Sequence, residues 1–385
     1  MTHLHLTTPA NLLREKIATK EAKIGVIGLG YVGLPHALHY GQKGFSVLGI
    51  DINQERIAQL LSGDSYIDDV ADQDVATYLA NNQVATTFEL LPALDVIFID
   101  VPTPIDAQQQ PDLTALKSAA SQVIAHVRQG QLIILESTSY PTTTLEHLVT
   151  PLLEKGLTPG KDIFIAFSPE RVDPGNQQFN FDNTPKLVGG VTETCTSLAM
   201  AVIGDMAVAV SSPEVAEMAK LYENTFRFVN IALADELSKL CHQLNIAIDE
   251  VLTAAATKPF GFMRFDPAVK IGGHCIGVDP FYLQWYMAQQ QLSTPLINTA
   301  AKIDASMLDF LMVKLLTALT EEGLSISGAR IGVLGVTYKK NISDTRMSAA
   351  PELVNILLNH GSKVSLFDSH VSSLSVKGQQ LPVSP

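Results

Sequence analysis

The segment that most restricts the fold lies near the start of the chain, at residues 23–51. An apolar run, Ile24–Ile27, leads into three glycines spaced as G-x-G-x-x-G, and helix-forming residues follow. A second apolar run, Phe45–Ile50, ends at Asp51, which lies 23 residues after Gly28. Strand, glycine turn, helix, strand and acid appear in the order that a dinucleotide-binding βαβ unit requires. We therefore expect an α/β fold that begins with such a unit.

The residue types of this unit fit a bound NAD molecule. Gly28, Gly30 and Gly33 let the backbone approach a pyrophosphate, and the helix that follows offers N–H groups and a positive dipole end. Asp51 can accept hydrogen bonds from both ribose hydroxyls and repels a 2′-phosphate, so NAD is favoured over NADP. A glycine-rich turn in another kind of α/β protein is the competing interpretation, but it leaves Asp51 unexplained.

Three more apolar strands are expected farther along the chain. They lie at Val96–Val101, Leu132–Leu135 and Ile163–Phe167, with helical stretches between them. This alternation predicts a parallel sheet with helices on both faces. Because ligands of such sheets bind beyond the carboxyl ends of the strands, the loops after these runs form the expected rim of an active site.

A long helix is predicted from about Pro213 to Leu244. Ser211 and Glu214 have the spacing of a capping box, and apolar residues recur at helical intervals after them. Lys220 lies four residues before Asn224, on the same face. From spacing alone, a solvated polar stripe is the ordinary explanation of that pair. Another helical stretch is expected over residues 296–322.

The last part of the chain repeats the pattern of the first unit. The segment IGVLG at 331–335 is similar to IGVIG at 24–28. A helix is expected over Ala350–Asn359, before a strand that ends at Asp368. This weak duplication predicts a second Rossmann-like domain. Since it lacks G-x-G-x-x-G, we expect it to bind a different phosphate ligand. The cations that could hold a diphosphate there are Lys339, Lys340 and Arg346.

Length and composition restrict the number of domains, the partners and the cellular location that we expect for the protein. Its 385 residues suggest two or three domains, and 46% hydrophobic against 17% charged residues allow a large core. A net charge of −13 argues against a general nucleic-acid binder. Three cysteines are too few for a disulfide framework, and neither a signal-peptide pattern nor a membrane-length apolar run is present. We expect a soluble, cytoplasmic protein with no metal site and with no nucleic-acid or membrane partner.

Cys275 is the candidate nucleophile. Two glycines precede it and leave room for a ligand to reach the sulfur, and Asp279 follows at +4. A reactive thiol needs access and either a lowered pKa or a nearby base, for which His274 and Lys220 are candidates. A buried structural thiol is the alternative, and the residues alone favour neither interpretation.

The chain resembles the nucleotide-sugar 6-dehydrogenases, that is, the UDP-glucose and UDP-N-acetylhexosamine dehydrogenase family, from about Lys23 to Asp368. The motifs that carry the resemblance are GLGYVGLP (28–35), EST (136–138), FSPER (167–171), AKLYENTFR (219–227), GGHCIGVDP (272–280) and GVTYKKNISDTRMSAAPEL (335–353). It implies two Rossmann-like parallel-sheet domains joined by a long central helix and a helical dimerisation domain. It also implies NAD-dependent, four-electron oxidation of the C6 hydroxyl of a UDP-sugar to the uronate, through a Cys275 thiohemiacetal and thioester, in surface polysaccharide biosynthesis.

The resemblance also implies a role for each matching residue. The NAD-binding residues would be Gly28, Gly30, Tyr31, Val32, Gly33, Asp51, Arg56, Thr103 and Thr138. The substrate-binding residues would be Glu170, Arg171, Lys220, Asn224, Arg264, Gly272, Lys339 and Arg346. The catalytic residues would be Cys275, Lys220, Asn224, Asp279, Glu170 and Thr138. Among these, Cys275 would be the nucleophile, Lys220 would stabilise an oxyanion and Glu170 would position the hydrolytic water.

The choice of sugar substrate rests on the similarity of two segments to one branch of this family. The sequences around Cys275 and around residues 168–176 look more like those of the N-acetylhexosamine branch of the family. UDP-N-acetylglucosamine is therefore the first choice, ahead of UDP-N-acetylmannosamine, UDP-N-acetylgalactosamine and UDP-glucose. Two other hypotheses stay open: a two-electron hydroxyacid dehydrogenase of the 6-phosphogluconate type, and a non-catalytic protein that binds NAD or a UDP-sugar.

Four parts are expected along the chain. They are an N-terminal helical extension (1–22), an NAD-binding Rossmann domain (23–211), a central helical domain with the cysteine loop (212–325) and an incomplete UDP-sugar-binding domain (326–385). The chain stops sooner after Asp368 than family members do, so either the last domain is shortened, with an exposed sheet edge, or a partner covers that edge. The apolar stripe of the central helix predicts a homodimer built on it.

Overall fold

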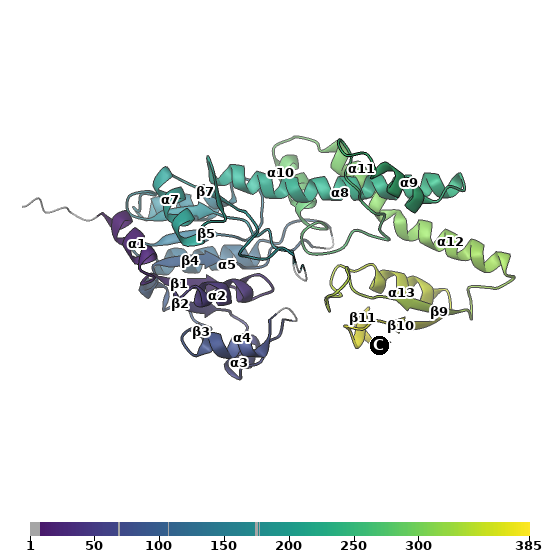
Figure 1. Ribbon diagram of the computed structural model, residues 1–385, viewed down its shortest axis with the longest axis horizontal. Helices are drawn as coiled ribbons and strands as arrows, with labels where there is room; N and C mark the ends of the chain where they lie inside the picture. The colour runs from purple at the N-terminus through teal and green to yellow at the C-terminus, as the bar shows by residue number, and fades with distance from the viewer. Residues whose placement is uncertain (1–7, 68–69, 107, 174–175, 177) are drawn as a thin grey trace, which may run out of the picture. The chain divides into compact units, whose positions relative to one another are not determined.

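The computed structural model describes residues 8–67, 70–106, 108–173, 176 and 178–385. The chain divides into two units, and the division falls after Leu221, inside the long helix α8 (Pro213–Gln243; Figure 1). The first unit contains a sheet of eight strands, and the second contains helices and a sheet of four strands. Within the described ranges, no helix is both long and apolar enough to cross a membrane.

The sheet of the first unit is built from the predicted apolar runs. Its strands lie in the order β3-β2-β1-β4-β5-β6-β7-β8, and every neighbouring pair is parallel except β6 and β7. Their bounds are Lys23–Ile27 (β1), Ser46–Ile50 (β2), Gln83–Ala85 (β3), Val96–Ile99 (β4), Leu132–Leu135 (β5), Phe164–Phe167 (β6), Lys186–Gly190 (β7) and Ala207–Val210 (β8). The mainly parallel sheet confirms the predicted fold class.

Helices cover both faces of this sheet, because successive side chains of a strand point to opposite faces. Val96 and Phe98 of β4 belong to a core shared with α1, α2 and α7, whereas Ile97 and Ile99 belong to a core shared with α5. The helical segments are α1 (Pro9–Ala18), α2 (Gly33–Gln42), α3 (Gln54–Leu61), α4 (Asp72–Leu79), η1 (Leu91–Ala93), α5 (Thr114–His126), η2 (Leu145–Val149), α6 (Thr150–Glu154) and α7 (Glu193–Ile203).

The second unit continues α8 and ends in a smaller sheet of order β11-β12-β10-β9. Its further elements are α9 (Ile248–Ala255), α10 (Asp279–Gln289), α11 (Pro295–Ala305), α12 (Met307–Glu321), β9 (Arg330–Leu334), α13 (Ala350–Asn359), β10 (Lys363–Phe367), β11 (Ser373–Val376) and β12 (Gln379–Ser384). The helical stretch expected over 296–322 is thus two helices, divided at Ser306, where α11 ends.

The tail after Asp368 contributes two strands to this smaller sheet. It forms β11 and β12, an antiparallel pair joined at Lys377 and Gly378, both of which have positive φ. Two such residues in succession are typical of a tight hairpin turn. β12 then pairs with β10 in parallel, while β9 forms the other edge of the sheet with Leu334 82% exposed.

The burial of Lys220 and Asn224 on α8 contradicts the explanation of this pair as a solvated polar stripe. Lys220 and Asn224 are buried, whereas apolar residues of the same helix are exposed, among them Tyr222 (67%), Leu233 (60%) and Leu240 (51%). The spacing is therefore not that of a solvated polar stripe. Buried polar side chains need partners, and both residues have them, as described below.

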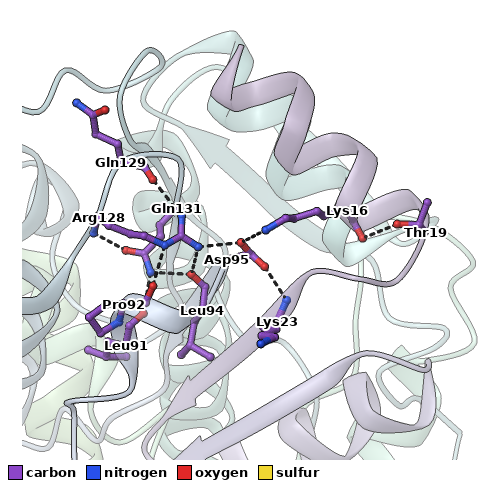
Figure 2. A network of polar contacts seen from close by, with 10 residues as sticks. All are labelled: Lys16, Thr19, Lys23, Leu91, Pro92, Leu94, Asp95, Arg128, Gln129 and Gln131. Atoms are coloured by element: carbon purple, nitrogen blue, oxygen red, sulfur yellow. Dashed lines mark hydrogen bonds and ion pairs between the residues drawn. The ribbon is translucent and has the colours of Figure 1, made fainter. Parts of the chain in front are cut away.

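A polar network lies at the amino-terminal ends of β1, β4 and β5 (Figure 2). The Asp95 carboxylate accepts hydrogen bonds from Lys16 Nζ at 2.8 Å, Lys23 N at 3.0 Å and Arg128 Nη2 at 2.9 Å. Gln131 Nε2 donates to the carbonyl oxygen of Leu94, which also accepts from Arg128. Burial alone would raise the pKa of Asp95, but the three donors outweigh it and lower that pKa.

We expect Asp95→Asn to lower the stability of the protein at pH 7, because the charged acceptor of three donors is lost. Hydrogen bonds to a charged group are worth about 2 kcal/mol, which corresponds to a fall in Tm of about 4–8 °C here. Since the folded-state pKa is lowered, this stability exists above the unfolded pKa of about 4 and is lost as the pH falls through the folded value. Calorimetry should therefore find a smaller difference in Tm between the wild type and Asp95→Asn at low pH than at pH 7.

The matched control is Asp309→Asn, which changes an exposed aspartate of α12. A Tm of Asp95→Asn equal to that of the wild type at pH 7 would contradict the stabilising role of the network.

Candidate active site

The turn between β1 and α2 has little space at two of its glycines. Gly28 has φ +92°, and a Cβ there would lie 2.7 Å from the carbonyl oxygen of Asp100. A Cβ at Gly33 would lie 1.8 Å from the carbonyl oxygen of Gly28. At Gly30, in contrast, an added Cβ would meet no atom within 4 Å. The helix therefore starts directly at the strand end, with open space at the middle of the turn.

This geometry fits the pyrophosphate of a dinucleotide. Exposed Tyr31 and half-buried Val32 complete the turn, and Val32, the N-cap of α2, makes no side-chain capping hydrogen bond. The positive end of the helix dipole thus lies at the turn without a side-chain cap, an arrangement that favours a bound phosphate.

Asp51 lies buried at the carboxyl end of β2. Its Oδ1 accepts a hydrogen bond from Asn53 N at 2.8 Å, and its Oδ2 accepts one from Leu29 N at 2.9 Å. Arg56 Nη1 lies 3.4 Å from the same Oδ2, and the guanidinium lies over the ring of Tyr66. The acid is therefore fixed to the glycine turn, where a carboxylate suits the ribose hydroxyls of NAD.

The loops after β4 and β5 are bonded to each other. Thr103 Oγ1 donates to the carbonyl oxygen of Thr138 at 2.6 Å, and Ser137 Oγ donates to that of Val101 at 2.8 Å. The two threonines expected near the cofactor thus lie together, beyond the carboxyl ends of neighbouring parallel strands.

Glu170, three residues after β6, is held through both its side chain and its backbone. Oε1 accepts from the N–H groups of Arg171 and Val172, each at 2.6 Å, and Oε2 lies 3.2 Å from Lys186 Nζ. Its carbonyl oxygen accepts from Lys220 Nζ at 2.6 Å. Burial alone would raise the pKa of Glu170, but Lys186 and the two N–H groups outweigh burial and lower it. The side chain is thus held as an anion.

A buried polar cluster lies below these loops, and the sequence did not predict that its members meet. Lys186 Nζ lies 2.7 and 2.8 Å from the two carboxyl oxygens of Glu136, and His36 Nδ1 lies 2.9 Å from Asp100 Oδ2. Burial raises the pKa of Glu136 to about 8 and that of Asp100 to about 7, and it lowers the pKa of His36 to about 4. Burial would also lower the pKa of Lys186, but the Glu136 and Glu170 carboxylates outweigh it and raise that pKa.

Part of this cluster had a signal in the sequence. Asp100 and Glu136 each directly follow an apolar strand, so parallel pairing brings them to one edge of the sheet. Lys186 and His36 had no such signal, because each meets its partner only through the tertiary fold.

In the second unit, Cys275 is exposed in the turn before α10. Its carbonyl oxygen accepts from Asp279 N at 2.9 Å. The preceding glycines pack on Tyr338: a Cβ at Gly272 would lie 2.8 Å from the Tyr338 Cβ, and one at Gly273, which has φ +91°, would lie 3.0 Å from its ring. The cysteine loop therefore lies directly against the segment that follows β9.

Asp279 connects the cysteine loop to the central helix. It is buried at the first turn of α10, and its Oδ2 accepts from Asn224 Nδ2 at 2.5 Å. Cys275, Asp279 and Asn224 thus lie together in the second unit. Lys220 is four residues before Asn224 on α8, and its bond to Glu170 lies within the first unit.

The cations expected to bind the nucleotide lie beside the cysteine loop. Arg346 Nε and Nη2 donate to the two oxygens of Asp344 at 2.9 and 2.7 Å, and His274 Nε2 lies 3.0 Å from Asp344 Oδ2. Burial alone would raise the pKa of Asp344, but His274 and Arg346 outweigh it and hold it well below its usual range. Lys339 Nζ lies 6.0 Å from the centroid of the Tyr338 ring.

Two of the expected substrate ligands have polar partners elsewhere. Arg264 binds Asp266 Oδ1 through Nε and Nη2 at 2.9 and 2.8 Å, and its Nη1 donates to Thr253 at 3.0 Å. Arg171 Nη1 donates to the carbonyl oxygen of Pro185 at 2.8 Å. The substrate roles of both arginines stay predictions.

Three consecutive parts of the chain match one family. They match the NAD binding domain (residues 22–206), the central domain (214–306) and the UDP binding domain (332–384) of the UDP-glucose/GDP-mannose dehydrogenase family.

Individual relatives cover most of the chain. A UDP-N-acetyl-D-glucosamine 6-dehydrogenase from Pseudomonas aeruginosa is 37% identical over 362 residues, which is 92% of this chain and 84% of that protein. The protein of the same name from Salmonella typhi is 34% identical over 374 residues, 94% of this chain and 86% of that protein. The solved structure of a UDP-D-ManNAc dehydrogenase from Pyrococcus horikoshii matches with a TM-score of 0.84 at 34% identity, covering 91% of this chain and 84% of that one.

The NAD match agrees with the glycine turn and Asp51, and the UDP match falls on the domain whose first loop contacts the cysteine segment. Because the three domains of one family follow one another in order, the chain belongs to the UDP-glucose/GDP-mannose dehydrogenase family and is an NAD-dependent UDP-sugar dehydrogenase.

Proposed function

We propose that this protein oxidises the C6 hydroxyl of a UDP-N-acetylhexosamine, UDP-N-acetyl-D-glucosamine first, to the corresponding UDP-uronate in two successive oxidations. The observation that carries the proposal is the packing of the exposed Cys275 loop on Tyr338 and beside the Asp344–Arg346 pair. In that position the thiol lies close to the domain that matches the UDP binding domain of the family. A thiol beside the sugar suits a reaction that must retain an aldehyde until it is oxidised further.

The overall change from alcohol to carboxylate removes four electrons, so NAD+ supplies the acceptor for two hydrides per sugar. Cys275, as the thiolate, forms a C–S bond to the aldehyde carbon and gives a thiohemiacetal after the oxygen is protonated. Loss of the C6 hydride and of the hydroxyl proton gives the thioester. Water then attacks the carbonyl carbon, the C–S bond breaks and the thiolate leaves.

Charged groups of the chain fit the other requirements of this chemistry. Lys220 would stabilise the oxyanion that develops on the C6 oxygen. Asp279, oriented by Asn224, would accept protons directly or through a water molecule. Glu170 is a weak base because its pKa is lowered, so orienting the hydrolytic water suits it better than taking the proton of that water.

The choice of sugar rests on relatives. The Pseudomonas aeruginosa and Salmonella typhi proteins are named for UDP-N-acetyl-D-glucosamine, whereas the Pyrococcus horikoshii structure is titled for UDP-D-ManNAc. We therefore propose UDP-N-acetyl-D-glucosamine, with UDP-N-acetylmannosamine as the second candidate. No comparison supports the non-catalytic alternative.

We also propose the domain limits and the assembly. The NAD-binding part would end at residue 211, the helical part at 325 and the UDP-sugar-binding part would follow. The exposed apolar face of α8, which includes Tyr222, Leu233 and Leu240, supports a homodimer built on that helix.

A panel of UDP-sugars with NAD+ tests the reaction and the sugar together. We expect two NADH for each UDP-N-acetyl-D-glucosamine consumed, with the uronate as product, and slower turnover of the other sugars. The NADH absorbance and the product mass check both expectations. One NADH per sugar, with an aldehyde released, would contradict the proposed reaction.

Cys275→Ser should stop the reaction after the first oxidation, because a serine hydroxyl is a far weaker nucleophile toward the aldehyde than a thiolate. We expect kcat for uronate formation to fall by about 1,000-fold or more. The matched control is Cys241→Ala, which changes a buried cysteine of α8 and should retain turnover. Equal uronate formation by Cys275→Ser and the wild type would rule out covalent catalysis at this thiol.

Asp51→Asn should weaken the preference for NAD over NADP. The substitution removes the charge that repels a 2′-phosphate and leaves Arg56 nearby to attract it, so we expect the ratio of kcat/KM for the two cofactors to fall by about 10–100-fold. Asp64→Asn, at an exposed position, is the control. An unchanged ratio in Asp51→Asn would mean that Asp51 does not contact the ribose.

A further inference from the structure

Lys186 is a buried cation to which the proposed chemistry gives no role. It is the first residue of β7 and is 7% exposed, and its ammonium lies between two acids from the ends of β5 and β6. The distances are 2.7 and 2.8 Å to the Glu136 oxygens and 3.2 Å to Glu170 Oε2. Burying an ammonium is costly even when it is paired, and a well-packed apolar residue often serves stability as well or better. The cost of burying this ammonium therefore indicates a contribution beyond stability.

The contacts of Lys186 lead to two proposed catalytic residues. Lys186 holds Glu170 Oε2, while the N–H groups of Arg171 and Val172 hold Oε1. The carbonyl oxygen of the same Glu170 accepts the bond from Lys220 Nζ. A side chain that fixes Glu170 therefore also fixes the backbone group that orients Lys220.

We propose that Lys186 is a positioning residue for thioester hydrolysis: it fixes the Glu170 carboxylate as an anion that orients water, and it fixes the carbonyl group that orients Lys220. The inference rests on the function proposed above. Lys186 acts through Glu170 and has no proposed contact with the substrate or the cofactor.

A metal ion is the competing occupant of the cluster. His36, Asp100 and Glu136 lie close enough together to share one. The Lys186 ammonium, however, already lies within 2.8 Å of both Glu136 oxygens, and His36 lies at hydrogen-bond distance from Asp100. A divalent cation would bring two more positive charges beside a buried ammonium, so the cation of this cluster is Lys186 itself.

Removing the cation should change the titration of Glu170. The groups that face its carboxylate or bind its carbonyl are Lys186, His36, Tyr40, Asp100, Glu136 and Lys220. Of the groups named, Lys186 has the largest lowering effect on the pKa of Glu170, so its loss raises that pKa. In Lys186→Met, the rise of kcat with pH that reflects ionisation of Glu170 should therefore move to higher pH than in the wild type.

The experiment compares Lys186→Met, Glu136→Gln and the double variant, which removes both members of one ion pair and so avoids an uncompensated charge. We expect kcat to fall by about 100-fold in Lys186→Met and in the double variant, with KM for the UDP-sugar little changed and acyl-enzyme accumulating in acid-quenched samples. Glu136→Gln leaves Lys186 on Glu170 and should keep kcat within about threefold of the wild type. Lys186→Arg should recover part of the loss.

Lys16→Met is a matched control, because it removes a lysine–carboxylate pair at the opposite edge of the same sheet and should leave kcat unchanged. Wild-type kcat in the double variant would overturn the proposal, since it would mean that Lys186 only balances the charge of Glu136. Equal losses in Glu136→Gln and Lys186→Met would overturn it as well. The NADH yield of the wild type, measured in parallel, separates the two claims: one NADH per sugar contradicts the proposed function itself.

Discussion

The site in the first unit depends on how closely α2 approaches the end of β1. Only a hydrogen atom fits between Gly33 and the carbonyl oxygen of Gly28, since a Cβ would lie 1.8 Å from that oxygen. This contact brings the helix N-terminus to the edge where the neighbouring parallel strands end. Asp100, Glu136 and Glu170, which follow three of those strands, then reach one polar cluster under the same loops. The cofactor turn thus depends on this contact, which also places His36 of α2 beside Asp100, whereas strand pairing brings the acids of the cluster to one edge.

A second close approach has the same effect on the cysteine loop. Gly272 and Gly273 have no side chains to separate the loop from Tyr338, and the Asp344 carboxylate binds both His274 and Arg346. Cys275, the proposed nucleophile, and Arg346, a cation proposed to bind the nucleotide, are therefore parts of one local structure. In both units, glycine provides the close packing, and buried carboxylates with partners hold the neighbouring functional groups.

Local pattern was enough to predict much of the fold and part of the candidate site. The turn at Gly28–Gly33, the acid at Asp51 and the helix of Lys220 and Asn224 were all predicted, because spacing along the chain determines them. The pairing of Lys186 with Glu136 was not predicted, because it joins residues 50 positions apart through antiparallel and parallel strand neighbours. The hairpin of β11 and β12 was not predicted, because its two strands are short and only the Lys377-Gly378 turn between them carries a local signal.

In the proposed reaction, the sugar becomes covalently bound to Cys275 between the two oxidations. The most direct measurement is peptide mass mapping of enzyme quenched in acid during turnover with UDP-N-acetyl-D-glucosamine and NAD+. We expect the peptide containing Cys275 to gain the mass of the UDP-uronyl group, bound as a thioester that hydroxylamine removes. Hydrolysis should be slow in Glu170→Gln and Lys186→Met, so the modified peptide should accumulate in these variants. If the peptide stays unmodified in both of them, although the wild type forms uronate at full rate, covalent binding to Cys275 is contradicted.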